Sequence, residues 1–239
     1  MRLDQLLVKK GLVESREKAK ELIKNGLVLV NNKPILKPSK DIDQNSKIEV
    51  KESFKYVTRG GYKLEYAVKF FNIEIFDKVC CDIGCSFGGF TDFLIKNSAK
   101  KVYAIDNGDV LREELRQNPK IIYFKNTDVL SLTSLPEKVE ICTIDVTFES
   151  IKDILVHVKN FLNNDSIVLA LIKPPFEIEK SEKNKIKKLN EEKSFQIAKE
   201  IESYASKIGY DVIGICKSTI YGKKAKQVEY FLCLKFKNI

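Results

Sequence analysis

The sequence predicts an α/β protein in which a mostly parallel sheet is covered on both faces by helices, with a small α+β unit in front of it. Short apolar runs alternate with stretches of helical periodicity through most of the 239 residues, as they do when crossover helices join parallel strands. A glycine-rich turn follows the first of these runs. The first 50 residues have a separate apolar pattern, which predicts a second, smaller domain.

Seven apolar runs have the length and composition of buried strands. The last two leave no room for a helix between them, so they are expected to form an antiparallel hairpin. The predicted strands are Val79–Ile83, Val102–Asp106, Ile121–Phe124, Ile141–Asp145, Ile167–Ile172, Asp211–Cys216 and Val228–Leu234. The predicted helices between them are Asp92–Asn97, Leu111–Gln117, Ile151–Phe161 and Glu191–Lys207.

Residues 1–50 are expected to form two short helices and two strands, followed by a linker at residues 51–58 and the larger domain at residues 59–239. Ser15 has the residue type of an N-cap for the second helix, and Gly26 that of its C-terminal stop. The apolar faces of the two helices consist of Leu3, Leu6 and Leu7, and of Ala19, Leu22 and Ile23. Strands are expected at Val28–Val30 and Lys47–Val50, with a turn at Asn31-Asn32.

Composition limits the classes of protein to consider. With 44% hydrophobic and 31% charged residues, the chain has the balance of an ordinary globular protein rather than a disordered one. Its 42 Lys and Arg against 33 Asp and Glu give a net charge of +9. This excess favours a polyanionic partner, because neutralising phosphates releases counterions.

A membrane location and a metal centre are both disfavoured. The longest apolar run, Ile167–Ile172, has six residues, whereas a membrane-spanning helix needs about 20. From Met1 onward the chain reads as an amphipathic helix rather than a signal segment. Most of the six cysteines fall in predicted strands, no CxxC pair exists and His157 is the single histidine. We therefore expect a cytoplasmic protein with reduced cysteines and no metal site.

A row of cations distinguishes the second predicted helix. Arg16, Lys20 and Lys24 recur at every fourth position, which places them on one stripe opposite the apolar face. Such a row is either a solvated helix face or a surface that binds RNA phosphates. The sequence from Arg2 to about Val50, beginning R-L-D-Q-L-L-V-K-K-G-L-V-E-S-R, resembles the RNA-binding domain named after ribosomal protein S-four. This resemblance favours the second interpretation.

The stretch V-C-C-D-I-G-C-S-F-G-G-F-T-D, from Val79 to Asp92, joins the first strand of the larger domain to its first helix. Open α/β sheets bind ligands at this end of a strand, and glycines there let the backbone approach a ligand. The spacing differs from the G-x-G-x-x-G of dinucleotide sites. The stretch resembles the cofactor turn of S-adenosylmethionine-dependent methyltransferases, in which an acidic residue suits a cationic cofactor. Cofactor contacts are expected at Asp82, Gly84, Ser86, Gly88, Gly89 and Phe90.

Two further strands end beside a carboxylate. Asp106 ends the second strand, 106 − 82 = 24 residues after Asp82, where a carboxylate is placed to accept hydrogen bonds from a ribose diol. Asp128 follows the third strand and is placed to meet an adenine amino group. Each alone is well explained as a helix cap or a turn residue. Three carboxylates at successive strand ends beside a glycine turn favour an S-adenosylmethionine site.

Four residues form a candidate catalytic set: Lys63, Asp145, Lys173 and Glu229. Methylation of a ribose hydroxyl needs a base, and a lysine acts as one only if its pKa falls well below about 10.4. Lys63 is expected to lower the pKa of Lys173, while Asp145 and Glu229 orient the two amines. Taken singly, a strand-end lysine such as Lys173 is typical of a solvated surface residue, and Glu229 of a charge on an edge strand. Spacing alone cannot bring Lys63 and Glu229 together.

The order and landmarks of these four residues are similar to the catalytic tetrad of the FtsJ-like ribose 2′-O-methyltransferases. With R-G-G-Y-K-L at residues 59–64 and the N-terminal module, the whole chain resembles the TlyA family of bacterial ribosomal RNA cytidine 2′-O-methyltransferases, often labelled haemolysin A. The resemblance implies a Rossmann-like class I methyltransferase fold with a seven-stranded sheet. It also implies S-adenosylmethionine as methyl donor and ribosomal RNA or ribosomal subunits as partner. RNA contacts are expected at Arg2, Arg16, Lys20, Lys24 and Arg59.

Four segments depart from the pattern of that family, one of them Asp106–Leu111, which is one residue short and lacks the expected Gln. Pro175 stands where Gln is usual, a Lys-rich run occupies Glu179–Lys188, and Lys226-Gln227 replaces a Gly-Asn pair. These departures keep open a second function, that of a non-catalytic RNA-binding or ribosome-assembly protein with a methyltransferase fold. A membrane-lysing toxin is disfavoured because no long apolar run exists. A base methyltransferase is disfavoured because Val-Thr-Phe, rather than Pro-Pro-aromatic, follows Asp145.

Overall fold

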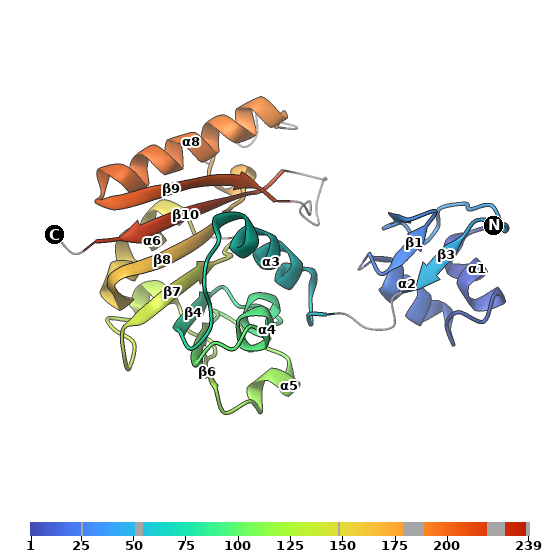
Figure 1. Cartoon of the computed structure of the whole chain (residues 1–239), viewed down its shortest axis with the longest axis horizontal. Coiled ribbons are helices and arrows are strands. Elements are labelled where there is room, and N and C mark those ends of the chain that lie inside the picture. Colours follow the sequence, from blue (N-terminus) through green and yellow to red (C-terminus); the bar gives the residue numbers. More distant parts are fainter. Residues whose placement is uncertain (25, 51–54, 148, 179–188, 219–227, 238–239) are drawn as a thin grey trace. The chain divides into compact units, whose positions relative to one another are not determined.

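The structure is a computed structural model of the chain, and it describes residues 1–24, 26–50, 55–147, 149–178, 189–218 and 228–237. The chain divides into two compact units, Met1–Thr58 and Arg59–Ile239. In Figure 1 the first unit is coloured in blues, and the second runs from blue-green to red. Each unit has its own cluster of buried apolar side chains. Such separate cores are typical of independent domains.

The first unit packs two helices against a three-stranded antiparallel sheet of order β2-β1-β3. Its elements are α1 (Leu3–Lys9), α2 (Arg16–Lys24), β1 (Val28–Val30), β2 (Lys33–Pro34) and β3 (Ile48–Val50). Both predicted helices and both predicted strands are present. The core includes every predicted apolar residue of the two helices, namely Leu3, Leu6, Leu7, Ala19, Leu22 and Ile23.

The ends of α2 follow the predicted signals. The Lys18 backbone N–H donates to Ser15 Oγ at 3.1 Å, which is the contact of a helix N-cap. Gly26 has a φ of +78°, the left-handed conformation that commonly ends helices. The sequence pattern does not predict β2. Asn31 and Asn32, at φ of +51° and +62°, turn the chain from β1 into β2 in the manner of a tight hairpin.

The second unit is built on a seven-stranded sheet of order β6-β5-β4-β7-β8-β10-β9. Neighbours from β6 to β8 pair in parallel, and β10 is antiparallel to both β8 and β9. The predicted fold class and the predicted antiparallel pairing of the last two strands are therefore confirmed. The strands are β4 (Val79–Ile83), β5 (Lys101–Ile105), β6 (Ile121–Phe124), β7 (Val139–Ile144), β8 (Leu162–Ile172), β9 (Tyr210–Lys217) and β10 (Tyr230–Phe236).

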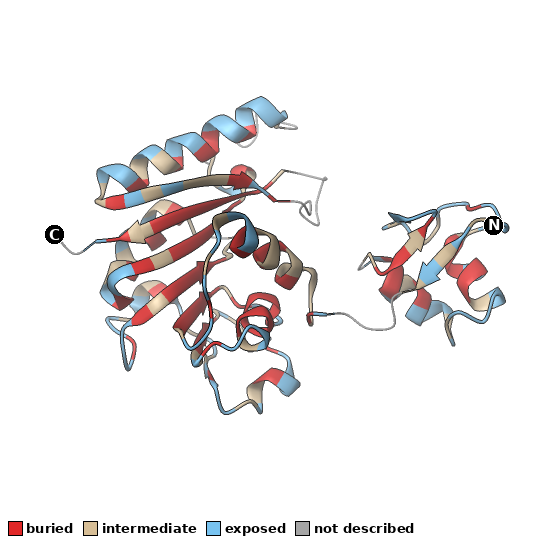
Figure 2. Cartoon of the chain, in the orientation of Figure 1, coloured by how far each residue is buried: buried red, intermediate tan, exposed pale blue. Residues whose placement is uncertain are grey.

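Helices cover both faces of this sheet, with α3 and α4 packed together on one face and α6 and α8 on the other (Figure 1). The central strands β4, β7 and β10 are almost entirely buried, whereas the edge strands β6 and β9 are largely half-buried or exposed (Figure 2). The predicted helix at Ile151–Phe161 is divided into α6 and a 3-10 turn at Val158–Phe161. The helices are α3 (Arg59–Phe71), α4 (Gly89–Lys96), α5 (Glu113–Arg116), α6 (Ile151–His157) and α8 (Glu191–Lys207).

Helix α3 is a further element that the sequence interpretation missed. Its buried positions Leu64, Ala67 and Val68 have helical spacing, but Gly60 and Gly61 in its first turn lower the intrinsic helix propensity. Packing against α4 and β9 stabilises the helix instead. The omission matters for function, because α3 carries one of the predicted catalytic residues.

In the described part of the chain, no helix is long and apolar enough to cross a membrane. All six cysteines are buried and free; five lie in strands and Cys85 lies in the glycine turn. His157 is the last residue of α6, and its Nε2 lies 2.7 Å from the Leu132 carbonyl oxygen. This contact gives the single histidine a structural role.

Candidate active site and RNA-binding surface

Three of the predicted catalytic residues meet at one edge of the sheet. Asp145 and Lys173 come directly after β7 and β8, whose carboxyl ends lie side by side because these strands are parallel. Glu229 directly precedes β10, which runs antiparallel to β8, so its start lies at the same edge. Extending the β8–β10 register by one residue beyond the pair Tyr230–Ile172 places Glu229 opposite Lys173.

Lys63 reaches this edge from α3. Its ammonium forms an ion pair with the Glu229 carboxylate, and the two residues are nearly inaccessible, at 8% and 6% exposed. They are 166 residues apart in the chain. That separation explains why no local spacing in the sequence joins them.

Asp145 and Lys173 form the second ion pair of the cluster. Lys173 Nζ also donates a hydrogen bond to the Val146 carbonyl oxygen at 3.0 Å. The side chains of Lys173 and Asp145 are 12% and 25% exposed, against 10% and 8% for Lys63 and Glu229. The Asp145–Lys173 pair is therefore the one more open to a substrate.

The two pairs influence one another electrostatically. Burial raises the pKa of the Glu229 carboxyl above its ordinary value, and the adjacent Lys63 ammonium opposes that shift. Asp145 raises the same pKa and Lys173 lowers it, both by smaller amounts. The cluster combines two cations with two carboxylates, so its formal charges balance. The structure thus brings the whole predicted set together.

Other residues of the protein pack closely against the glycines of the turn after β4. Gly84 has a φ of +76°, and a Cβ built there would lie 2.6 Å from the Asp145 carbonyl oxygen. Gly88 has a φ of +92°. The left-handed backbone therefore favours glycine at both positions, and the Asp145 backbone leaves no room for a side chain at Gly84. The sequence pattern suggests only close approach to a ligand.

Asp82 lies within β4 and is completely buried. Its carboxylate accepts hydrogen bonds from Thr91 Oγ1 at 2.6 Å and from Thr143 Oγ1 at 3.0 Å. Burial raises its pKa to about 7, although the two hydroxyl groups oppose the shift. The sequence interpretation treats Asp82 as a direct cofactor contact, whereas these bonds join β4 to α4 and β7. Neither threonine is singled out by the sequence analysis, because both look like ordinary core positions.

Asp106 is attached to the glycine turn. Its two carboxylate oxygens accept hydrogen bonds from the backbone N–H groups of Ser86 and Gly108, each at 2.8 Å. Ser86 is exposed and has a φ of +51°, so this bond helps to hold an unusual backbone conformation. Carboxylate oxygens have further lone pairs. Asp106 therefore keeps acceptor capacity for a ribose diol.

The remaining predicted cofactor residues lie in different surroundings. Asp128 is exposed and accepts a hydrogen bond from the Leu130 N–H at 2.9 Å, which makes it the N-cap of a 3-10 turn. Gly89 and Phe90 open α4. The ring of Phe90 is 3% exposed and packs against Phe231, with ring centroids 6.0 Å apart. Phe90 therefore contributes its side chain to the core of the unit.

In the first unit, two predicted RNA-binding residues share one buried carboxylate. Arg2 contacts Asp4 through Nε at 3.0 Å and Nη2 at 2.9 Å, and Arg16 Nη2 lies 3.3 Å from the same carboxylate. The Asp4 side chain is 0% exposed, whereas the arginines are 42% and 46% exposed. Hydrogen bonds from both arginines lower the pKa of Asp4 to about 2, against the opposing effect of desolvation. The sequence analysis does not single out Asp4, although an acid among the apolar residues of α1 is a visible signal.

The other predicted RNA contacts lie elsewhere. Lys20 is 3.8 Å from the Glu17 carboxylate on the same helix, and Lys24 is exposed in the last turn of α2. Arg59 is the first residue of α3 and belongs to the second unit. Among the predicted RNA-binding residues, the structure therefore joins Arg2 and Arg16 through a common partner.

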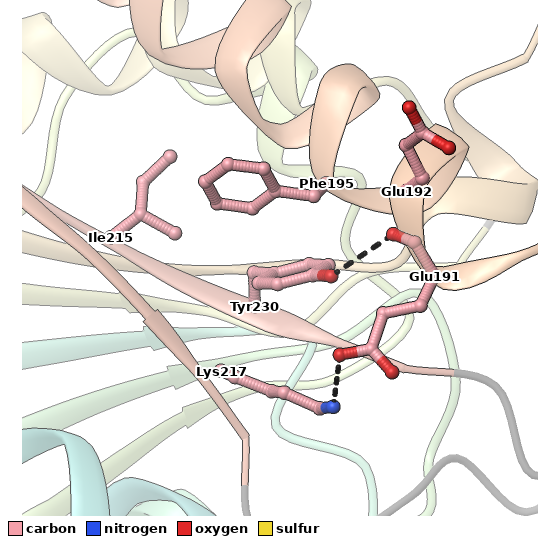
Figure 3. Close-up of a pocket in the computed structure, with 6 residues that line it drawn as sticks. All are labelled: Glu191, Glu192, Phe195, Ile215, Lys217 and Tyr230. Atoms are coloured by element: carbon pink, nitrogen blue, oxygen red, sulfur yellow. Dashed lines mark hydrogen bonds and ion pairs between the residues drawn. The ribbon is translucent and has the colours of Figure 1, made fainter.

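A pocket of about 390 Å³ lies on the α8 face of the sheet (Figure 3). Tyr230 and Phe195 meet there with ring centroids 5.7 Å apart, and the Tyr230 hydroxyl donates to the Glu191 carbonyl oxygen at 3.5 Å. Side chains alternate across a strand, so Tyr230 points away from the face on which Glu229 meets Lys63. These contacts hold the start of β10, and with it Glu229, from the opposite side. The lining residues are Glu191, Glu192, Phe195, Ile215, Lys217 and Tyr230.

The segment after Lys173 is tied to the segment after Asp145. Glu177 accepts hydrogen bonds from Ser150 Oγ at 2.9 Å and from the Ile151 N–H at 3.3 Å. Burial raises the pKa of the Glu177 carboxyl above its ordinary value. The sequence analysis does not identify this residue, because its partners are distant in the chain.

Of the segments that depart from the TlyA pattern, Asp106–Leu111 and Pro175 are described. Pro175 lies in the 3-10 turn Pro174–Phe176, directly after Lys173. Glu179–Lys188 and Lys226-Gln227 lie outside the described residues.

The fold and site define a class of protein. A sheet of this strand order, with a glycine turn after β4 and a carboxylate after β5 that bonds to the turn, is that of an S-adenosylmethionine-dependent methyltransferase. The model of the FtsJ-like methyltransferase family matches residues 56–236, and that of the S4 domain matches residues 1–48. The chain belongs to the FtsJ-like methyltransferase family and carries an S4 domain at its N-terminus.

Similar proteins include TlyA of Campylobacter jejuni, named a 23S rRNA (cytidine-2′-O)-methyltransferase, which is 35% identical over 97% of this chain and 98% of its own length. Hemolysin A of Brachyspira hyodysenteriae is 39% identical over 77% of this chain and 79% of its own. A solved structure from Streptococcus thermophilus, provisionally named a hemolysin, superposes with a TM-score of 0.74 at 32% identity, covering 100% of this chain and 89% of the other. An S-adenosylmethionine-dependent methyltransferase from Mesorhizobium loti shares the fold, with a TM-score of 0.52 at 11% identity over 72% of this chain and 97% of the other.

Proposed function

We propose that this chain transfers a methyl group from S-adenosylmethionine to the 2′-hydroxyl of a cytidine in ribosomal RNA. The observation that carries the proposal is the cluster of Lys63, Asp145, Lys173 and Glu229 at the ligand-binding edge of a methyltransferase sheet. The printed name of the Campylobacter jejuni relative supports a cytidine ribose as acceptor. Matches to the S4 domain and to a methyltransferase family support RNA as the substrate.

The chemistry around the glycine turn fits S-adenosylmethionine, which supplies a methyl group activated by a sulfonium. Asp106 bonds to both sides of the turn and retains acceptor capacity for ribose hydroxyls. Asp82 lies in β4, two residues before Gly84, and is completely buried; its carboxylate favours a cationic ligand nearby. Asp128 is exposed after β6 and is assigned to the adenine amino group.

Lys173 is assigned the role of general base. In its neutral form, the amine takes the proton of the 2′-hydroxyl as the oxygen bonds to the methyl carbon and the carbon–sulfur bond breaks. Asp145, in contact with Lys173, stabilises the ammonium that forms. Proximity supplies much of the rate, because both reactants are held at one sheet edge.

Lys63 and Glu229 are assigned a supporting role. Their ion pair joins α3 to the start of β10, so it fixes the positions of these two elements beside Lys173. Because the pair is nearly inaccessible, it also keeps a fixed positive and a fixed negative charge close to Lys173. The S4 domain is assigned the capture of RNA phosphates through Arg2, Arg16 and the lysines of α2.

Lys173→Ala tests the assignment directly. We expect methyl transfer from labelled S-adenosylmethionine to unmodified ribosomal subunits to fall at least about a hundredfold, the contribution typical of a general base. Cofactor affinity measured by calorimetry should stay close to that of the unchanged protein. Lys235→Ala is the matched control, because Lys235 is also a β-sheet lysine in an ion pair, with Asp165, but lies at the other end of β10.

The modified nucleotide should then be mapped. Methylation of a ribose oxygen of cytidine is the expected result, and methylation of a base would contradict the proposal. Full activity of the Lys173→Ala variant would show that the base is a different group. Cofactor binding by the unchanged protein without transfer to any ribosomal RNA would support the non-catalytic RNA-binding alternative.

A further inference from the structure

Asp4 is a buried carboxylate on the apolar face of α1. Its neighbours on this helix, Leu3, Leu6 and Leu7, are core residues of the first unit. A buried carboxylate costs free energy unless cations or hydrogen-bond donors compensate it. Here the compensation comes from Arg2, Arg16 and the Gln5 N–H, which donates to Asp4 Oδ1 at 3.1 Å.

The contacts fix the arginines in orientation. Arg2 uses Nε and Nη2 on the two oxygens of Asp4, which is the bidentate geometry that a planar guanidinium favours. Arg16, from the start of α2, meets one of the same oxygens. One carboxylate therefore holds two guanidiniums, that of Arg2 just before α1 and that of Arg16 at the start of α2.

The backbone around Asp4 is also held. The Asp4 N–H donates to the Pro38 carbonyl oxygen at 3.0 Å, and the Leu3 N–H donates to the Lys40 carbonyl oxygen at 2.9 Å. Arg2 forms an isolated antiparallel bridge with Asp41. The carboxylate that orients the arginines thus belongs to a rigid part of the unit.

Both arginines remain open to solvent. Their side chains are 42% and 46% exposed, and a guanidinium has more N–H donors than the Asp4 contacts use. Two cations share one anion, so the group carries a net positive charge. A rigid, half-exposed pair of guanidiniums has the chemistry of a phosphate-binding site.

We propose that Asp4 is a positioning residue for RNA binding, which holds Arg2 and Arg16 as a preformed pair for a phosphodiester of ribosomal RNA. The inference rests on the proposed function, because it assumes that the S4 domain binds ribosomal RNA. Preformed side chains bind more tightly because their conformational freedom is lost before association rather than during it.

For the RNA affinity of an Asp4→Asn variant, this proposal predicts a change opposite to the one expected from net charge alone. Asp4→Asn removes a negative charge and raises the net charge of the chain from +9 to +10, which alone would tighten binding to RNA. Loss of preformation should instead weaken it. Glu17→Gln is the matched control, because it makes the same charge change next to Arg16, at an exposed carboxylate that contacts Lys20.

The test measures the Kd of the full chain for unmodified 23S ribosomal RNA over a series of salt concentrations. Asp4→Asn should raise Kd about three- to tenfold, the cost of ordering one or two long side chains on binding. Glu17→Gln should leave Kd unchanged or lower it. Equal or tighter binding by Asp4→Asn would overturn the proposal.

Two further variants separate a positioning role from a fold defect and from failure of the proposed function. Arg2→Lys should weaken binding strongly in the unchanged protein but only slightly in the Asp4→Asn background, provided that thermal unfolding shows both to be folded. Additive effects would overturn the positioning role even if Asp4→Asn lowers stability. If Arg2→Ala with Arg16→Ala leaves Kd unchanged, the assignment of RNA binding to this surface fails instead.

Discussion

In the first unit one buried carboxylate, Asp4, is shared by two half-exposed arginines, whereas in the second unit Lys63 and Glu229 pair one to one and are both buried. The pKa of Asp4 falls to about 2 because two cations outweigh its desolvation. The pKa of Glu229 is raised because desolvation outweighs its single close cation. The first arrangement leaves excess positive charge at the surface, as binding to a polyanion requires. The second pairs its charges out of water and joins α3 to the start of β10.

Asp82, like Glu229, is a carboxylate whose pKa is raised by desolvation. It is completely buried, and hydroxyl groups rather than cations bond to it. Burial therefore raises its pKa further above the ordinary range, to about 7. A carboxylate left without a close cation is costly for the folded protein, and a cationic cofactor would relieve that cost.

The largest effect is expected from Glu229→Gln. The variant leaves Lys63 as a buried cation without its carboxylate, so the free energy of unfolding should fall by about 3 kcal/mol. Methyl transfer to ribosomal subunits should fall with it, since α3 and β10 lose their link. Asp165→Asn is the control, because its pair with Lys235 is largely exposed and worth about 1 kcal/mol or less. Unchanged stability and activity in Glu229→Gln would show that the cluster does not depend on balanced charge.

Asp82→Asn should separate stability from cofactor binding. Between an ordinary pKa of 3.8 and the folded value of about 7, the folded protein binds a proton that the unfolded chain has released. The stability of the unchanged protein should therefore decrease as pH rises through this window, and the variant should lack that decrease. At pH 8 the variant should be more stable by about 1–3 kcal/mol, yet bind S-adenosylmethionine more weakly. Calorimetric unfolding at pH 5 and pH 8, with cofactor titration, measures both; a variant that is less stable at pH 8 would contradict the prediction.

The smallest effect concerns Asp4, with the opposite pH dependence. Its pKa is lowered from 3.8 to about 2, so its contribution to stability is present above pH 4 and is lost as pH falls toward 2. Because both arginines are about half exposed, the contribution should be only about 1–2 kcal/mol. Pepsin cleavage within residues 1–50 of the full chain, located by mass spectrometry, should differ between the unchanged protein and Asp4→Asn at pH 4 and converge near pH 2. Equal cleavage rates at pH 4 would contradict the assignment.

Much of the fold follows from local patterns. The period of apolar residues identifies the strands, Ser15 and Gly26 mark the ends of α2, and the alternation of strand and helix implies the parallel sheet. Helix α3 cannot be predicted from local patterns, because Gly60 and Gly61 lower its helix propensity and packing against α4 and β9 stabilises it. Nor can the hairpin strand β2, because two residues carry too little pattern.

The candidate site also has features that sequence motifs identify and features that depend on contacts between distant residues. Lys63, Asp145, Lys173 and Glu229 can be named from motifs at strand ends and from a resemblance, but their pairing cannot, because Lys63 and Glu229 are 166 residues apart. Asp4 and Glu177 escape the sequence analysis because their roles depend on partners from other elements. Phe90 illustrates the reverse, since its motif position suggests a cofactor contact while its ring packs in the core.

The α/β class, the S4 module and the glycine turn can be recognised in the sequence, because each depends on residues close together in the chain. Which charges meet is visible in the folded protein alone: Lys63 with Glu229, Lys173 with Asp145, and two arginines on Asp4. Periodicity and turn chemistry are local, whereas ion pairing and burial depend on the packing of distant elements. Burial and nearby cations together set the pKa of each carboxylate: two arginines lower that of Asp4, whereas desolvation raises that of Glu229.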